Sequence, residues 1–152
     1  MELTTVEETI AIVLADIRTK SFSTIPPFEI GEVEERMKSF AAMNGITLGS
    51  DRIYMSAKQL QHSMRPSKSQ KDLVVSEEEL IHFPRNRFKM DLYFDGSCFI
   101  YTNGFSKFIV HPNYKLKIQR DIIQTVNYIT ATKVKDPAEF TLSKYAKIGT
   151  DR

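Results

Sequence analysis

The stretch RFKMDLYFDGSCFIYTNGFSKFIVH, residues 87–111, decides the fold of this chain. Apolar and polar residues alternate in RFKMDLYF, and the turn signal Asp95-Gly96 follows. The runs CFIYT and FSKFIVH come next, separated by Asn103-Gly104, which is the strongest short signal for a β-hairpin. Because alternation with a period of two is typical of strands with one buried face, the stretch predicts three successive antiparallel strands.

The residues after this stretch extend the predicted sheet. Pro112-Asn113 ends the third strand, and residues 115–119 give a weaker strand signal. Residues 122–134 predict a long last strand, because their many β-branched side chains suit the centre of a sheet. Pro137 then opens a last helical turn.

The residues before the stretch predict helices. Apolar residues recur at spacings of three and four in residues 2–20 and again in residues 30–44, and Pro26-Pro27 separates the two runs. A short strand at 53–55 and a helix over about 56–64 come next. Ser76 with Glu79 forms a capping box for a short helix that Pro84 is expected to end.

Helices followed by a meandering sheet predict an α+β fold. We expect the N-terminal helices to pack on one face of a four- to five-stranded antiparallel sheet, leaving the other face free for binding. Residues 1–152 are predicted to form one domain, with an acidic helical part at 1–50 and a basic core at 51–150.

Composition narrows the class of protein. The chain is 41% hydrophobic and 26% charged, as in ordinary globular domains. It has no apolar run of membrane-spanning length and no basic-then-apolar start, so we expect no membrane association and a cytoplasmic site of action. The single cysteine, Cys98, excludes an intrachain disulfide and a Cys-rich zinc site, and a buried inert thiol is expected there rather than a nucleophile.

Charge is unevenly distributed along the chain. Residues 1–50 contain 4 Lys and Arg against 8 Asp and Glu, a net charge of −4. Residues 51–152 contain 17 against 11, a net charge of +6, with aromatic residues interleaved. A basic surface with aromatics suits a polyanion such as a nucleic acid, although solubility alone can produce the same numbers.

The segment HSMRPSK, residues 62–68, has the composition of a nucleolytic site. It places His62, Arg65 and Lys68 within seven residues, so that one imidazole could move a proton while two cations hold a phosphate. A surface helix end, where the helix dipole favours cations, is the alternative for this segment.

Other candidates are weaker on sequence alone. His82 lies among apolar residues and is expected to be packed. His111 ends a strand near Lys115 and Lys117, and these three residues are candidates for substrate binding, with solvated strand positions as the alternative. Phosphate-binding Gly-rich loops, H-E-x-x-H and G-x-S-x-G are all absent from the sequence, which disfavours metal-dependent and serine-nucleophile chemistry.

Residues 53–148 resemble the phage- and toxin-associated nuclease families grouped as barnase–EndoU–colicin–RelE-like, or BECR. IYMSAKQLQHSMRPSK is similar to the family's entry segment, a serine and a helix with its histidine and basic followers, and DLVVSEEELIHFPRNRF to the short second helix. The strands from Met90 to His111 follow in order. VNYITATKV and then KYAKI resemble the closing strand with its threonine and the terminal tyrosine.

This resemblance implies a fold, an activity and a set of site residues. The fold is N-terminal helices on a four-stranded antiparallel sheet, and the activity is RNA cleavage without a metal or other cofactor. The catalytic residues that it implies are His62, Arg65 and Lys68, then Thr130 or Thr132, and Tyr145. The implied partners are an RNA substrate, with tRNA as one candidate, and a cognate immunity or antitoxin protein.

We therefore expect a metal-independent endoribonuclease domain of the toxin or effector type. Its expected site of action is the cytoplasm, either of the cell that makes it or of a target cell into which it is delivered. The alternative is a non-catalytic phage or mobile-element accessory module that keeps the same fold and binds a partner through its acidic helices. Which residue acts as base and which as acid stays open.

Overall fold

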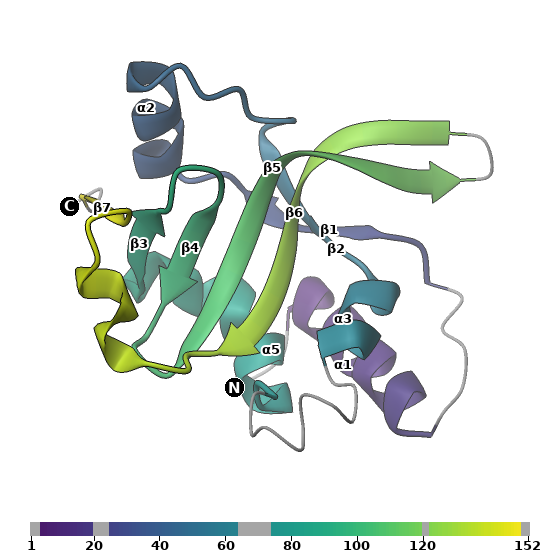
Figure 1. The fold of residues 1–152 in the computed structure, drawn as a ribbon. Coiled ribbons are helices and arrows are strands. Elements are labelled where there is room, and N and C mark those ends of the chain that lie inside the picture. The colour runs from purple at the N-terminus through teal and green to yellow at the C-terminus, as the bar shows by residue number, and fades with distance from the viewer. Residues whose placement is uncertain (1–3, 20–24, 64–73, 120–121, 150–152) are drawn as a thin grey trace.

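The computed structural model describes residues 4–19, 25–63, 74–119 and 122–149. Helices and strands alternate in the first half of the chain, and strands dominate the second half (Figure 1). The longer helices are α1 (Thr5–Arg18), α2 (Glu35–Met43), α3 (Ala57–Ser63) and α5 (Glu77–Asn86). The strands are β1 (Phe28–Glu32), β2 (Arg52–Met55), β3 (Asp91–Phe94), β4 (Phe99–Thr102), β5 (Ser106–Gln119), β6 (Ile122–Lys133) and β7 (Ala146–Ile148). Two short 3₁₀-helices, η1 (Arg87–Lys89) and η2 (Pro137–Thr141), complete the described elements.

The strands form one curled seven-stranded sheet in the order β1-β2-β6-β5-β4-β3-β7 (Figure 1). β2 and β6 run parallel, and all the other neighbours are antiparallel. The expected four- to five-stranded antiparallel sheet under N-terminal helices was therefore wrong, although helices and strands are both present as expected. The short strands β1 and β2 extend one edge of the sheet, and β7 extends the other.

The second predicted helix was also placed wrongly at its start. Residues expected to begin it at Ile30 form strand β1 instead, and α2 begins at Glu35. In β1 the buried Ile30 follows the exposed Glu29, which is the period of a strand. Gly31 lies against the guanidinium of Arg87, where a Cβ would stand 2.7 Å from Nη2, so a side chain at this strand position would require the guanidinium to shift.

Both predicted hairpin turns are present in the structure, and one predicted helix ends later than expected. Asp95-Gly96 and Asn103-Gly104 both connect adjacent strands, and both glycines have positive φ, as such turns require. The helix opened by Ser76 does not end at Pro84 but continues to Asn86. At this position Pro84 has no N–H to donate to the carbonyl of Leu80, so the helix loses one hydrogen bond there and ends two residues later.

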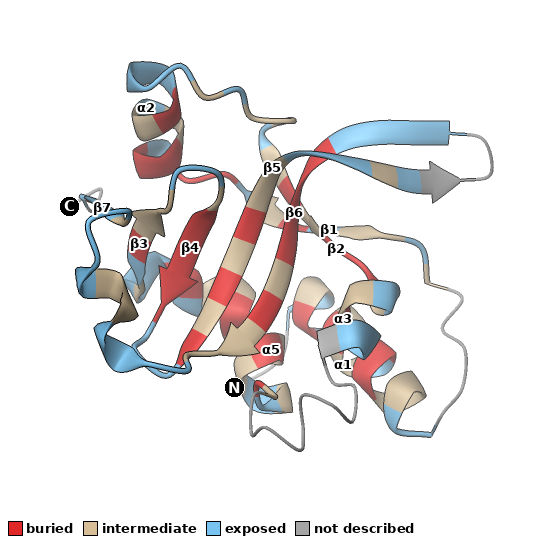
Figure 2. Ribbon diagram, viewed as in Figure 1, coloured by how far each residue is buried: buried red, intermediate tan, exposed pale blue. Residues whose placement is uncertain are grey.

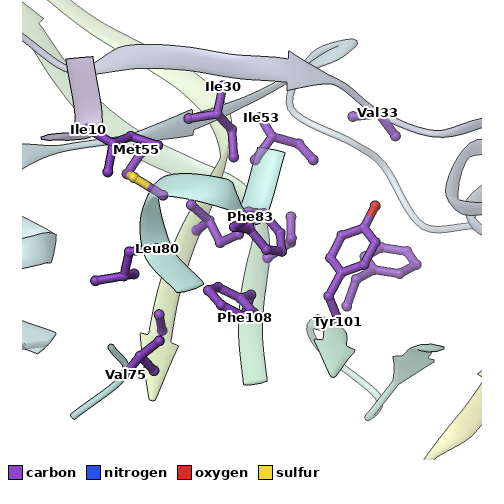
Figure 3. Packing of buried hydrophobic residues seen from close by; sticks show 14 of the residues in the cluster. Ile10, Ile30, Val33, Ile53, Met55, Val75, Leu80, Phe83, Tyr101 and Phe108 are labelled. Carbon is purple, nitrogen blue, oxygen red and sulfur yellow. The ribbon is translucent and has the colours of Figure 1, made fainter. Parts of the chain in front are cut away.

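Side chains from α1, α2 and α5 join side chains of the strands in one buried hydrophobic cluster. Phe83 of α5 stacks on Phe108 of β5 with ring centroids 4.2 Å apart, and meets Tyr101 of β4 edge-on at 5.5 Å (Figure 3). α1 contributes Ile10, Val13 and Leu14 to the same core, and α2 contributes Met37 and Ala41. The acidic N-terminal helices thus share their core with the strands of the basic part.

Different segments of the chain lie over different parts of the opposite face of the sheet, which we call the outer face. The segment around η2 packs over β3, where Phe140 stacks on Tyr93 at 4.9 Å. β5 and β6 continue past the rest of the sheet as a two-stranded ribbon (Figure 1). In the part of the chain that the structure describes, no helix combines the length and the apolar character needed to cross a membrane.

Candidate functional site

The outer face of β5 and β6 gathers several of the residues nominated from the sequence. Along β5, buried Phe108 and Val110 alternate with half-buried Lys107, Ile109 and His111, as Figure 2 shows. The pairing of β5 with β6 places Lys107 opposite Thr132, Ile109 opposite Thr130 and His111 opposite Tyr128. His111, Thr130 and Thr132 therefore share one face of the sheet, opposite the face on which Phe83 of α5 stacks on Phe108.

His111 lies between a threonine and the cysteine. Its Nε2 is 3.2 Å from Thr130 Oγ1, and its Nδ1 is 3.3 Å from Cys98 Sγ. Burial lowers the pKa of His111, and the carboxylate of Asp95 partly opposes this effect. The lowered pKa favours a neutral imidazole at pH 7, which can accept a proton. Burial raises the pKa of Cys98, so its half-buried sulfur is a thiol rather than a thiolate.

Two stacked tyrosines lie beside His111 on the ribbon side. The rings of Tyr114 and Tyr128 are 4.6 Å apart and almost parallel, at 19°. The centroid of Tyr114 is 6.5 Å from that of His111. The hydroxyl of Tyr128 contacts Ser56 Oγ at the start of α3, and this contact fixes the inner ring of the stack.

These tyrosines form one wall of a groove with a volume of about 470 Å³, which we name the tyrosine groove. Strand β5, the start of α3 and the segment before β1 surround it. Its lining residues are Ile25, Pro27, Ser56, Ala57, Lys58, Gln59, Tyr114, Lys115, Leu116, Lys117 and Tyr128. Among the lining residues that the structure describes, three are lysines and none is acidic, so this part of the groove has a positive charge.

His62 lies next to this groove on α3. The helix is capped by Ser56, whose Oγ accepts a hydrogen bond from the backbone N–H of Gln59 at 3.2 Å. Lys58 and Gln59 line both the tyrosine groove and a neighbouring hollow that includes His62. The ring of His62 is exposed. Arg65 and Lys68, which were expected to converge with His62, lie outside the described residues.

Tyr145 and Thr132 lie toward the other end of the outer face. The hydroxyl of Tyr145 donates a hydrogen bond of 2.9 Å to Glu139 Oε2, and Lys107 Nζ lies 3.0 Å from the same oxygen. Burial and the Glu139 carboxylate raise the pKa of Tyr145 to about 12, so its phenol stays protonated at neutral pH. This cluster ties η2 to β5.

The sequence did not identify Tyr114, Tyr128 or Ser56 as site residues. Strand 105–111 and the weak run 115–119 were predicted as separate, but both belong to β5. A bulge between His111 and Tyr114, with Asn113 at a φ of 59°, shifts the register so that Tyr114 pairs with Val126. The only signal in the sequence was Pro112-Asn113, which was interpreted as the end of a strand.

Among the described residues, no group of three or more His, Cys, Asp or Glu side chains is placed to hold a metal ion. No protein-family model matches the chain, and comparisons with curated proteins and with solved structures found no match. The site must therefore be interpreted from its own geometry and chemistry.

Proposed function

We propose that this protein is a metal-independent endoribonuclease and that its RNA substrate lies in the tyrosine groove. The observation that carries the proposal is a positive groove with an aromatic wall and two histidines next to its lining residues. Lys58, Lys115 and Lys117 supply the charge, and the described part of the lining contains no carboxylate. His111 adjoins the groove through Tyr114, and His62 adjoins it through the helix that carries Lys58.

These groups match what cleavage by the RNA's own 2′-hydroxyl requires. A base takes the proton from the 2′-oxygen as it attacks the adjacent phosphorus, and an acid protonates the departing 5′-oxygen. We assign the base to His111, because its lowered pKa favours the neutral form, and the acid to His62. Lysine ammonium groups stabilise the negative charge that gathers on the phosphorane oxygens. The products are a 2′,3′-cyclic phosphate and a 5′-hydroxyl.

The test is cleavage of a labelled RNA in excess EDTA, with the product ends identified by mass spectrometry. Wild-type protein is expected to leave 2′,3′-cyclic phosphate ends, and His62→Ala and His111→Ala are each expected to slow cleavage about 100-fold or more, the typical contribution of an acid or base. Lys89→Ala removes an exposed lysine outside the groove and serves as the control. Cleavage that depends on a divalent metal, or that survives both histidine variants, would contradict the proposal.

One observation favours the second candidate, a module that binds RNA without turnover. Both ring nitrogens of His111 have protein partners, Cys98 and Thr130, so accepting a substrate proton requires one of these contacts to open. For such a module, wild-type protein would bind RNA in a lysine-dependent manner but leave it intact. The cleavage assay and a binding assay on the same RNA separate the two functions.

A further inference from the structure

The tyrosine groove also indicates which form of RNA it accepts. We propose that it receives one unpaired nucleotide, whose base stacks on the ring of Tyr114, so that the protein selects single-stranded segments over duplex. This inference rests on the proposed RNA-directed function, and it deepens that function by naming the substrate class. Nothing in it depends on which residues move protons.

The ring of Tyr114 is both accessible and held in place. The residue keeps 43% of its surface exposed, although its ring is stacked on the buried Tyr128. Tyr128 is in turn fixed through its hydroxyl by Ser56. Stacking a base on such a ring costs little side-chain entropy, because the orientation of the ring is already set. Bases of every kind present a π-face, so stacking of this kind tolerates many sequences.

The size and the charge of the groove suit a nucleotide. A volume of about 470 Å³ fits the small end of the range for pockets that hold small molecules, about 300–1,000 Å³. The three lysines lie beside the aromatic wall, so a phosphate can meet an ammonium group while its base contacts Tyr114. By contrast, the hollow beside Phe88 is lined by three glutamates as well as by Lys38 and Arg87, so it lacks the excess of positive charge that suits a polyanion.

Duplex RNA cannot use this wall without first opening. In a helix, both faces of each base are stacked on neighbours and its edge is paired, so a base reaches Tyr114 only after unstacking, at a cost of a few kcal/mol. A loop or a single strand pays little of this cost. The groove therefore distinguishes the two forms by the state of the base rather than by its identity.

Binding of fluorescein-labelled 2′-fluoro RNA, measured by anisotropy, tests the inference without the complication of cleavage. The 2′-fluoro group removes the attacking hydroxyl, so affinity is measured whether or not the protein is a nuclease. The wild type is expected to bind a single strand more tightly than the same strand in a duplex. Tyr114→Ala should weaken single-strand binding roughly 5- to 150-fold, the effect of losing one base–aromatic stack.

Two matched variants separate stacking from other effects. Tyr114→Phe keeps the ring and should bind like the wild type, and Phe105→Ala removes an aromatic residue that is 78% exposed but does not line the groove. Equal affinity for single strand and duplex, or full affinity in Tyr114→Ala, would overturn the inference. In that event the cleavage assay in EDTA still decides the proposed function. Selective binding without any cleavage would support the groove and refute the nuclease.

Discussion

Replacing Glu7 by glutamine is expected to remove much of the acid sensitivity of this protein's stability. The carboxylate of Glu7 is fully buried between α1 and α5. It accepts a hydrogen bond of 3.0 Å from the backbone N–H of Thr4, lies 2.6 Å from His82 Nδ1 and contacts the guanidinium of Arg85. Burial raises the pKa of Glu7, but these hydrogen bonds outweigh burial and lower the pKa from 4.5 to about 2.

The size of the effect follows from this difference in pKa. Each pKa unit between the folded and unfolded states is equivalent to about 1.4 kcal/mol, so ionised Glu7 contributes about 3 kcal/mol to the free energy of unfolding. Because the folded-state pKa is depressed, the contribution is complete above pH 4.5 and is lost as the pH falls toward 2. Glu7→Gln has no proton to gain in this window. It should be about 3 kcal/mol less stable than wild type at pH 7 and nearly equal to it near pH 2.

Urea unfolding followed by circular dichroism at several pH values between 7 and 2 measures this convergence. Glu8→Gln is the matched control, because Glu8 is exposed in the same first turn of α1. The control should follow the wild type at every pH. A stability difference between Glu7→Gln and wild type that stays constant from pH 6 to 3 would refute the reasoning, since the effect would then not come from ionisation.

Three further predictions concern the junction of β2 with β6 and the histidine of the outer face. Asn127→Ala should lower the free energy of unfolding by about 2–4 kcal/mol in urea titrations, because its buried amide makes three hydrogen bonds to the segment that enters β2. Gly49→Ala should cost about 1–3 kcal/mol in the same assay, because a Cβ would stand 2.7 Å from the backbone of Val126, and equal stability would contradict this packing. Asp95→Asn removes the charge that raises the pKa of His111, so the pKa of the ring, measured by NMR titration, should fall. The acidic limb of the pH profile of cleavage should move to lower pH as well. A shift of either to higher pH would contradict this prediction.

The hairpins of this protein could be predicted because their signals are local. Asp95-Gly96 and Asn103-Gly104 supply the positive φ that each turn needs, and the Asn103 side chain accepts hydrogen bonds from the backbone N–H groups of Phe105 and Ser106. A turn of this kind depends on a few consecutive residues. It is therefore recognisable without knowledge of the rest of the fold.

Strand β1 was missed because its residues fit two periods at once. Ile30, Val33 and Met37 are spaced as on a helix, yet only Met37 lies in one. All three side chains are buried, so their burial in the core does not distinguish a helix from a strand. What decides for a strand is pairing with β2, a contact across about twenty residues that no local pattern records.

The candidate site was predicted as residue types but not as an arrangement. His111 and Thr130 were nominated for different reasons, and their contact depends on the register that places Ile109 opposite Thr130. The stack of Tyr114 on Tyr128 depends on the bulge after His111, because without the extra residues Tyr114 would take another partner on β6. A register and a bulge are properties of two strands together, so the sequence of one strand does not show them.

The parallel pairing of β2 with β6, which no local pattern of residues predicts, is the feature that assembles the groove. Tyr54 pairs with Tyr128, and because the two strands run in the same direction, β2 ends beside the part of β6 that runs from Tyr128 toward Thr130. The chain leaves β2 at Met55, and Ser56 immediately contacts the hydroxyl of Tyr128 and caps α3. An antiparallel β2 would release the chain at the opposite end of β6. The helix with Lys58 and His62 would then start far from the tyrosines, so the mixed sheet is what places the helix beside its aromatic wall.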